Sequence, residues 1–208
     1  EKGSVSISKL CNLNCYNCFF TEHRDTKAMK HAYFSVLEKI KGLKLKELKL
    51  TDVGEPFIYF DQLTLFLSSL RTDEDVKQIQ FITNATLLNK ERITELKEIS
   101  EKTGINYFFL PSIDGISKES YEAVRIGATF EKVIENLKYA IKIFGKENII
   151  ISYTVKQPAM KDAPYAKSFF MKNFGIMPNM YYDLFDSDCE DFIHKAEDLD
   201  IDDQPKEY

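Results

Sequence analysis

Long apolar runs are absent from this chain of 208 residues. No stretch approaches the roughly 20 consecutive apolar residues that a membrane-spanning helix requires, so the sequence predicts no transmembrane segment. Cysteine is also scarce: four cysteines in a chain of this length could cross-link little of the fold, and we expect no signal peptide before them. These absences disfavour a secreted disulfide framework, and we expect a cytoplasmic protein.

The sequence also lacks an excess of positive charge. The formal net charge is -5, and it is concentrated at the C-terminus, where residues 186–208 hold ten acidic residues against Lys195 and Lys206. The first 185 residues hold 26 basic and 23 acidic residues and are close to neutral. This balance gives no case for binding to nucleic acid or to a membrane surface. We predict one core domain, residues 1–185, followed by an acidic tail, residues 186–208.

Three of the four cysteines fall within eight residues: Cys11, Cys15 and Cys18 are spaced C-x3-C-x2-C. Thiolates bind soft metals, and closely spaced cysteines in a reduced protein usually hold an iron–sulfur cluster. A structural metal site normally takes four protein ligands, so a loop with three leaves one coordination position for another molecule. Together with His23 the three cysteines could instead form a zinc site, although the spacing lacks the usual two pairs of ligands.

The apolar pattern alternates between the periods of strands and helices. Strands are predicted at 4–8, 47–51, 78–83, 107–113, 149–155 and 179–184, and helices at 31–41, 61–70, 89–103, 117–125, 129–144 and 164–174. Strands that alternate with helices predict a parallel sheet with helices packed outside it. At about 31 residues per unit, the core holds six units rather than the eight of a closed barrel of roughly 250 residues. The predicted fold class is α/β, a partial (β/α)6 TIM-like barrel with parallel strands.

Short polar motifs follow several of the predicted strands. The sequence reads Val-Gly-Glu-Pro at 53–56, Thr-Asn-Ala at 83–85 and Ser-Ile-Asp-Gly at 112–115. Parallel strands place their carboxyl ends at one edge of the sheet, which forms the active face of such folds. We therefore expect these motifs and the cysteine loop to meet at that edge.

The cysteine spacing resembles the signature of the radical S-adenosylmethionine (radical SAM) enzymes. In that family the loop holds three irons of a [4Fe-4S] cluster, and SAM chelates the fourth iron. The resemblance implies Cys11, Cys15 and Cys18 as metal ligands, and a [4Fe-4S] cluster and S-adenosyl-L-methionine as cofactors. It also implies that one electron from an external donor of the flavodoxin or ferredoxin type cleaves SAM to a radical, which takes hydrogen from the substrate.

Further residues match motifs of that family. The 53–56 motif looks like Gly-Gly-Glu-Pro, which implies that Gly54 and Glu55 reach the amino group of SAM, with Val53 departing from the first glycine. The 83–85 motif resembles Thr-Asn-Gly and adds Asn84 to the cofactor-binding residues. Asn17 stands where the family usually carries an aromatic residue before the third cysteine, a position that contacts adenine largely through its backbone.

The stretch from 112 to 137 is similar to the fourth strand and following helix of radical SAM enzymes that modify peptides and proteins, such as the anaerobic sulfatase-maturing group. This resemblance implies that Ser112 contacts SAM, that Arg125 pairs with the SAM carboxylate, and that Asp114 belongs to the same cofactor-binding motif. A guanidinium suits that role because it grips a carboxylate with two parallel hydrogen bonds. These relatives often carry a cysteine-rich C-terminal domain. Only Cys189 follows the sixth predicted strand, so these 208 residues lack that domain; either the enzyme works with a single cluster, or the domain lies beyond them.

Three hypotheses for function follow. The first is a radical SAM enzyme that modifies a peptide or protein, for example by epimerisation or cross-linking. The second keeps the enzyme class but has a small metabolite, such as a sugar or nucleoside, as substrate. The third is a non-catalytic iron–sulfur or zinc protein that stores or passes electrons.

Overall fold

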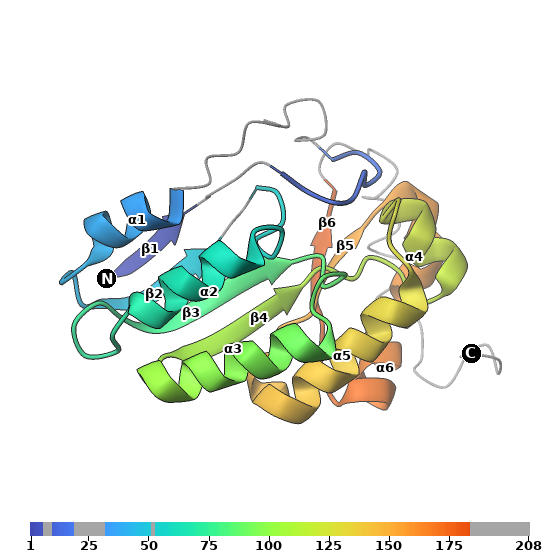
Figure 1. Ribbon diagram of the computed structural model, residues 1–208. Helices are drawn as coiled ribbons and strands as arrows, with labels where there is room; N and C mark the ends of the chain where they lie inside the picture. The colour runs from blue at the N-terminus through green and yellow to red at the C-terminus, as the bar shows by residue number, and fades with distance from the viewer. Residues whose placement is uncertain (6–9, 19–31, 51–52, 184–208) are drawn as a thin grey trace.

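The computed structural model describes residues 1–5, 10–18, 32–50 and 53–183 (Figure 1). Within these ranges, strands and helices alternate along the chain. The strands are β1 (Lys2–Val5), β2 (Leu45–Leu50), β3 (Val76–Thr83), β4 (Asn106–Pro111), β5 (Ser152–Val155) and β6 (Asn179–Tyr182). The helices are α1 (Ala32–Ile40), α2 (Phe60–Ser69), α3 (Lys90–Thr103), α4 (Lys118–Val124), α5 (Phe130–Phe144) and α6 (Ala163–Phe174), with two 3-10 turns, η1 (Lys146–Asn148) and η2 (Gln157–Asp162).

All of the strand pairs in the described part of the chain are parallel. The first four strands form one sheet in the order β1-β2-β3-β4, and β5 pairs with β6. Two isolated parallel bridges, Phe109 to Ile149 and Ser112 to Ser152, join the β4 side of the first sheet to the β5 segment. The strands therefore follow one another in chain order around a partial barrel, which confirms the predicted fold class.

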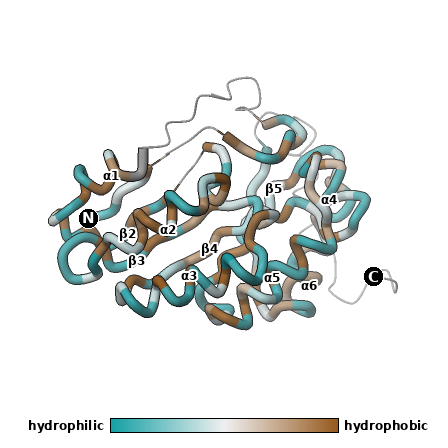
Figure 2. Tube along the Cα trace, in the orientation of Figure 1, coloured by the Kyte–Doolittle hydropathy of each residue, from teal (hydrophilic) through white to brown (hydrophobic). Residues whose placement is uncertain are grey.

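The core lies between the sheet and the helices. Alternate strand residues such as Ile79, Phe81 and Phe109 are buried, and the Phe109 ring lies 4.8 Å from the ring of Phe144 on α5. Figure 1 shows α2, α3 and α5 side by side across β2, β3 and β4. Hydrophobic and hydrophilic positions alternate along α3 and α5 (Figure 2), as expected of helices that bury one side.

The other face of the sheet carries polar residues. The nearly buried carboxylate of Glu47 on β2 accepts hydrogen bonds from the Nε2 atoms of Gln78 at 2.6 Å and Gln80 at 3.0 Å, both on β3. Lys2 Nζ on β1 lies 3.3 Å from the same carboxylate. Because strand side chains alternate between faces, these residues lie opposite the apolar core.

Some predicted boundaries differ from the observed ones. The strand predicted at 149–155 begins only at Ser152, because η1 turns the chain immediately before Ile149, which makes a single bridge. The helix predicted from Asp61 begins at Phe60, so Asp61 lies in the first turn of α2, where its charge suits the positive end of the helix dipole. Residues 6–8 of the first predicted strand, residue 184 of the last, and the acidic tail with Cys189 lie outside the described residues.

No helix among the described residues is both long enough and apolar enough to cross a membrane.

Candidate functional site

The described part of the cysteine loop, residues 10–18, lies beside the C-terminal end of α4 (Figure 1). The backbone N–H of Asn14 donates to the carbonyl of Ile126 at 2.9 Å, and that of Tyr16 donates to the carbonyl of Val124 at 2.8 Å. Leu13, directly before Asn14, is 1% exposed and anchors the loop in the protein. The loop is thus fixed along its length by a short backbone ladder.

The three cysteines of the loop are partly exposed. The Sγ atom of Cys11 accepts from the Leu13 backbone N–H at 3.5 Å and from Asn84 Nδ2 at 3.7 Å, and the Sγ atom of Cys15 accepts from Arg125 NH1 at 3.8 Å. Across the described ranges, no three His, Cys, Asp or Glu side chains are grouped closely enough to hold one metal ion. A four-iron cluster binds each thiolate through a different iron, so its ligands stand farther apart than the ligands of one ion. The loop therefore fits a cluster by its donor atoms and by the N–H groups directed at its sulfurs; the alternative ligand His23 lies outside the described residues.

Glu55 lies directly against this loop, at the turn that follows β2. Its backbone N–H donates to the carbonyl of Leu10 at 2.7 Å. Its carboxylate is buried and accepts from Thr83 Oγ1 at 2.8 Å and from the Asn84 backbone N–H at 2.8 Å. Burial raises the pKa of the Glu55 carboxyl to about 7, against the opposing effect of these hydrogen bonds. Gly54 before it has a φ of 81°, a left-handed conformation that explains the glycine.

Arg125 follows α4 and lies on the other side of the cysteine loop. Its NH2 atom lies 2.5 Å from Oδ2 of Asp114, which is fully buried, and Oδ1 of Asp114 accepts the Thr154 backbone N–H at 2.8 Å. The guanidinium is therefore held between β4 and β5 while its NH1 atom faces Cys15. The Nε atom of Arg125 is buried and has no hydrogen-bond partner among the described residues, so one donor remains for another group.

Ser112 and Gly115 belong to the segment that links β4 to α4. Ser112 is half-buried and bonds through its backbone N–H to the Thr83 carbonyl at 2.8 Å, which places it next to the 83–85 motif. A Cβ at Gly115 would lie 2.4 Å from the backbone nitrogen of Tyr121. Only glycine allows α4, and with it Arg125, to approach so closely.

Asn17 lies apart from the Glu55 and Arg125 contacts. It has a φ of 51°, and its Nδ2 atom donates to Oδ2 of Asp183, just after β6, at 3.3 Å. The same carboxylate oxygen lies 3.1 Å from Nζ of Lys156, just after β5, and this ammonium also donates to the Tyr16 carbonyl at 3.3 Å. These contacts join the loop to the ends of the last two strands.

The structure thus gathers the expected residues at the carboxyl edge of the sheet, but it adds some that sequence reasoning missed. Asn12 and Thr86 share hydrogen bonds with Asn84, and Lys156 and Asp183 hold the loop. Lys156 and Asp183 directly follow strands, as the recognised motifs do, and this position is the signal that could have found them.

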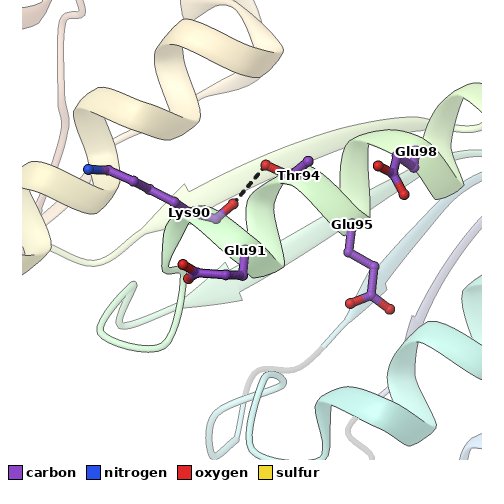
Figure 3. Close-up of a pocket in the computed structure, with 5 residues that line it drawn as sticks. All are labelled: Lys90, Glu91, Thr94, Glu95 and Glu98. Carbon is purple, nitrogen blue, oxygen red and sulfur yellow. Dashed lines mark hydrogen bonds between the residues drawn. The ribbon is translucent and has the colours of Figure 1, made fainter.

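A separate surface hollow lies on the exposed side of α3, lined by Lys90, Glu91, Thr94, Glu95 and Glu98 (Figure 3). All five side chains are exposed, and Lys90 is paired with Glu135 of α5 at 2.9 Å. None of them belongs to the strand-end motifs, so this hollow is distinct from the cysteine site.

Comparisons with known proteins agree with this geometry. The sequence model of the Radical SAM superfamily matches residues 5–158. A probable GTP 3',8-cyclase of Methanococcus maripaludis is 27% identical over 146 residues, which cover 67% of this chain and 45% of that protein. A GTP 3',8-cyclase of Alkaliphilus oremlandii is 26% identical over 146 residues, 67% of this chain and 42% of that protein. The chain thus spans less than half the length of these curated relatives.

Among solved structures, the fold is similar to that of TsrM from Kitasatospora setae, a radical S-adenosylmethionine methyltransferase with tryptophan substrate and a SAM analogue bound. The TM-score is 0.60 at 12% identity, and the match covers 88% of this chain and 35% of that one. At such low identity the likeness concerns the fold alone. Because the superfamily match covers most of the chain, from β1 to η2, the chain belongs to the radical SAM superfamily, a family of enzymes that use a [4Fe-4S] cluster and S-adenosylmethionine.

Proposed function

We propose that this chain is the core of an enzyme that binds a [4Fe-4S] cluster through Cys11, Cys15 and Cys18 and cleaves S-adenosylmethionine reductively. One observation carries the proposal: direct hydrogen bonds join the cysteine loop to the Glu55 turn and to Arg125. When bound, the reduced cluster supplies the electron that breaks a carbon–sulfur bond of SAM and gives an adenosyl radical able to take hydrogen from a substrate.

The surrounding residues are suited to holding SAM at this loop. The carboxylate of Glu55 would take the amino group of SAM, beside the backbone of Gly54. Arg125 would take the SAM carboxylate through its unpartnered Nε, while Asp114 keeps the guanidinium in place. Ser112 lies on the same strand-end segment, and its hydroxyl is a candidate contact for the nucleoside part.

Two further residues complete the proposed cofactor site. Asn84 faces the loop directly, through Cys11. Asn17, in its left-handed conformation, would present backbone groups to the adenine. The radical step itself needs no general base, so the contribution of these residues is binding and orientation.

For the substrate, two classes have support. A nucleotide is supported by the curated relatives that are named GTP 3',8-cyclases. A peptide or protein, modified for example by epimerisation or cross-linking, is supported by the resemblance of residues 112–137 to the peptide-modifying branch. We infer an external one-electron donor of the flavodoxin or ferredoxin type in either case. We also infer a reducing compartment, the cytoplasm, because cluster ligands must be thiolates.

The test of the proposed function is anaerobic reconstitution with iron and sulfide, followed by SAM and dithionite, with 5'-deoxyadenosine and iron content as readouts. We expect about four irons per chain and formation of 5'-deoxyadenosine. Serine variants of Cys11, Cys15 and Cys18 should lose both, and Cys189→Ser is the matched control that should keep both. Bound zinc without deoxyadenosine, which is the non-catalytic alternative, would overturn the proposal.

The substrate class is tested separately with deuterated substrates. Deuterium transfer from labelled GTP into 5'-deoxyadenosine would support a nucleotide, and transfer from a labelled peptide would support peptide modification. If labelled nucleotides give no deuterium transfer and do not compete in SAM-dependent turnover, the nucleotide class is excluded.

A further inference from the structure

We propose that Asn84 and Arg125 raise the reduction potential of the cluster by donating N–H groups to the thiolates of Cys11 and Cys15. This inference rests on the proposed function, because it takes the three cysteines as cluster ligands. It gives Asn84 a role toward the cluster itself, and Arg125 a second role beside that toward SAM.

The orientation of the Asn84 amide is determined by its neighbours. Its Oδ1 atom accepts the Thr86 backbone N–H at 3.0 Å and the Thr86 hydroxyl at 2.6 Å. A backbone N–H can only donate, so the oxygen of the amide must face Thr86 and the NH2 group must face the other way. That NH2 group donates to Asn12 Oδ1 at 3.0 Å and to Cys11 Sγ at 3.7 Å. The contacts with Thr86 therefore make Asn84 present a hydrogen-bond donor to the sulfur of Cys11.

The rest of this network is consistent with that orientation. Asn12 Nδ2 donates to Thr86 Oγ1 at 2.8 Å, and the Thr86 hydroxyl donates in turn to Asn84 Oδ1. Thr86 and Asn84 are both buried, so the network is largely shielded from water. Asn12 at the outer end of the network is exposed, but the buried Thr86 and Asn84 hold the Asn84 donor in place before any ligand arrives.

Arg125 is held just as firmly at the second sulfur. Its guanidinium is fixed by the ion pair with Asp114, which is in turn fixed by the backbone of Thr154. The side chain of Arg125 is only 16% exposed, so the charge is weakly screened where NH1 faces Cys15. Arginine remains charged in proteins, so this thiolate always has a cation beside it.

Both contacts favour the reduced cluster. Reduction adds one electron, and the added negative charge spreads onto the sulfur ligands, where an N–H donor or a positive charge stabilises it. Hydrogen bonds to the sulfurs and net charge are among the factors that set the potential of iron–sulfur clusters. Removing a donor should therefore make the cluster harder to reduce, even when its three ligands are intact.

The experiment is an anaerobic redox titration of the reconstituted full chain without SAM, followed by electron paramagnetic resonance of the reduced cluster. The variant Asn84→Ser keeps a side-chain oxygen for the Thr86 backbone N–H, as serine does in such turns, but removes the amide donor. The variant Asn84→Asp keeps the shape and replaces the donor by a negative charge. We expect a more negative midpoint potential for Asn84→Ser than for the wild type, and a still more negative one for Asn84→Asp.

Thr86→Val is the matched control, because it removes the hydroxyl from the same network but leaves the Thr86 backbone N–H that orients Asn84. Its potential should equal that of the wild type. A wild-type potential in Asn84→Ser, or an equal shift in Thr86→Val, would overturn the inference. If Asn84→Asp does not take up iron, the midpoint potential of Asn84→Ser alone tests the inference.

Equal potentials in the wild type and Asn84→Ser, in a chain that cleaves SAM, would refute only this inference. A wild-type chain that binds no cluster would refute the proposed function as well.

Discussion

The buried carboxyl group of Glu55 makes the stability of the fold depend on pH. Its pKa in the folded protein is raised by burial from 4.5 to about 7. Below pH 4.5 the group is protonated in both the folded and the unfolded chain, so the fold bears no ionisation penalty. Between pH 4.5 and about 7 the unfolded chain ionises while the buried carboxyl of the folded chain stays protonated, so the folded state loses stability over this range. Above pH 7 the folded chain is ionised too, and the loss has reached its full size of about 3 kcal/mol.

We therefore predict that Glu55→Gln stabilises the cofactor-free protein relative to the wild type at pH 8 by more than it does at pH 5, with the difference approaching about 3 kcal/mol. Urea unfolding at the two pH values measures it. Glu119→Gln is the control, because the Glu119 side chain is 84% exposed. Equal pH dependence in wild type and Glu55→Gln would show that the carboxyl is not shifted.

The ion pair of Arg125 and Asp114 gives a second prediction. Replacing Arg125 by methionine leaves a buried, uncompensated carboxylate, and breaking such a pair typically destabilises a protein by about 3–5 kcal/mol. The double variant Asp114→Asn with Arg125→Met should recover part of this loss, because the lone charge is gone. Chemical unfolding of the two single variants and the double variant measures the coupling. Additive losses would mean that the two side chains do not depend on each other.

At the scale of elements, the packing of α4 depends on Gly115. We predict that Gly115→Ala destabilises the protein by about 2 kcal/mol or more, because its Cβ would lie 2.4 Å from the Tyr121 backbone nitrogen. Overpacking of a buried site typically costs roughly 1–3 kcal/mol. It should also weaken SAM binding, since Arg125 follows the same helix. Gly3→Ala is the control: its Cβ would meet the flexible side-chain ends of Leu45, at 3.3 Å, and Leu48, at 3.5 Å. Thermal unfolding and SAM titration are the measurements, and equal effects of the two variants would contradict the prediction.

The elements themselves could mostly be predicted from the sequence. Helix ends such as Asn89, whose side chain accepts the Arg92 backbone N–H, and Gly104, which is left-handed, carry their signals locally. Strand-end motifs could be placed together because parallel strands share one carboxyl edge. The start of β5 could not be predicted, since the apolar residues at 149–151 fit a strand equally well, and only the turn of η1 and the contact with Phe109 decide their conformation.

Side-chain pairs within the site could not be predicted for a different reason. The contact of Asn84 with Cys11 and that of Arg125 with Cys15 join residues 73 and 110 positions apart. No periodicity or turn signal in a single sequence reports which distant polar groups face each other. The motifs therefore identified the residues, and the fold was needed to show which atoms they contact.

At the scale of the whole molecule, Lys156 and Asp183 tie the cysteine loop to the far side of the barrel. Their side chains are only 13% and 8% exposed, and Lys156 also bonds to the Tyr16 carbonyl. We predict that Lys156→Met speeds the loss of iron to a chelator by roughly tenfold, because neighbours of metal ligands typically have effects of this size. The control is Lys161→Met, whose ion pair with Glu119 is exposed. Equal release rates for the two variants would show that the tie does not support the loop.

Cys11, Cys15 and Cys18 are synthesised before several of the groups that shape their loop. Asn12 depends on Thr86, 74 residues onward, the Tyr16 carbonyl on Lys156, 140 residues onward, and Asn17 on Asp183, 166 residues onward. Closing such long segments of chain requires the strands between them to be in place already. In the proposed enzyme, iron and sulfide would therefore enter a nearly finished barrel, because the loop takes its final shape only after these later residues have folded.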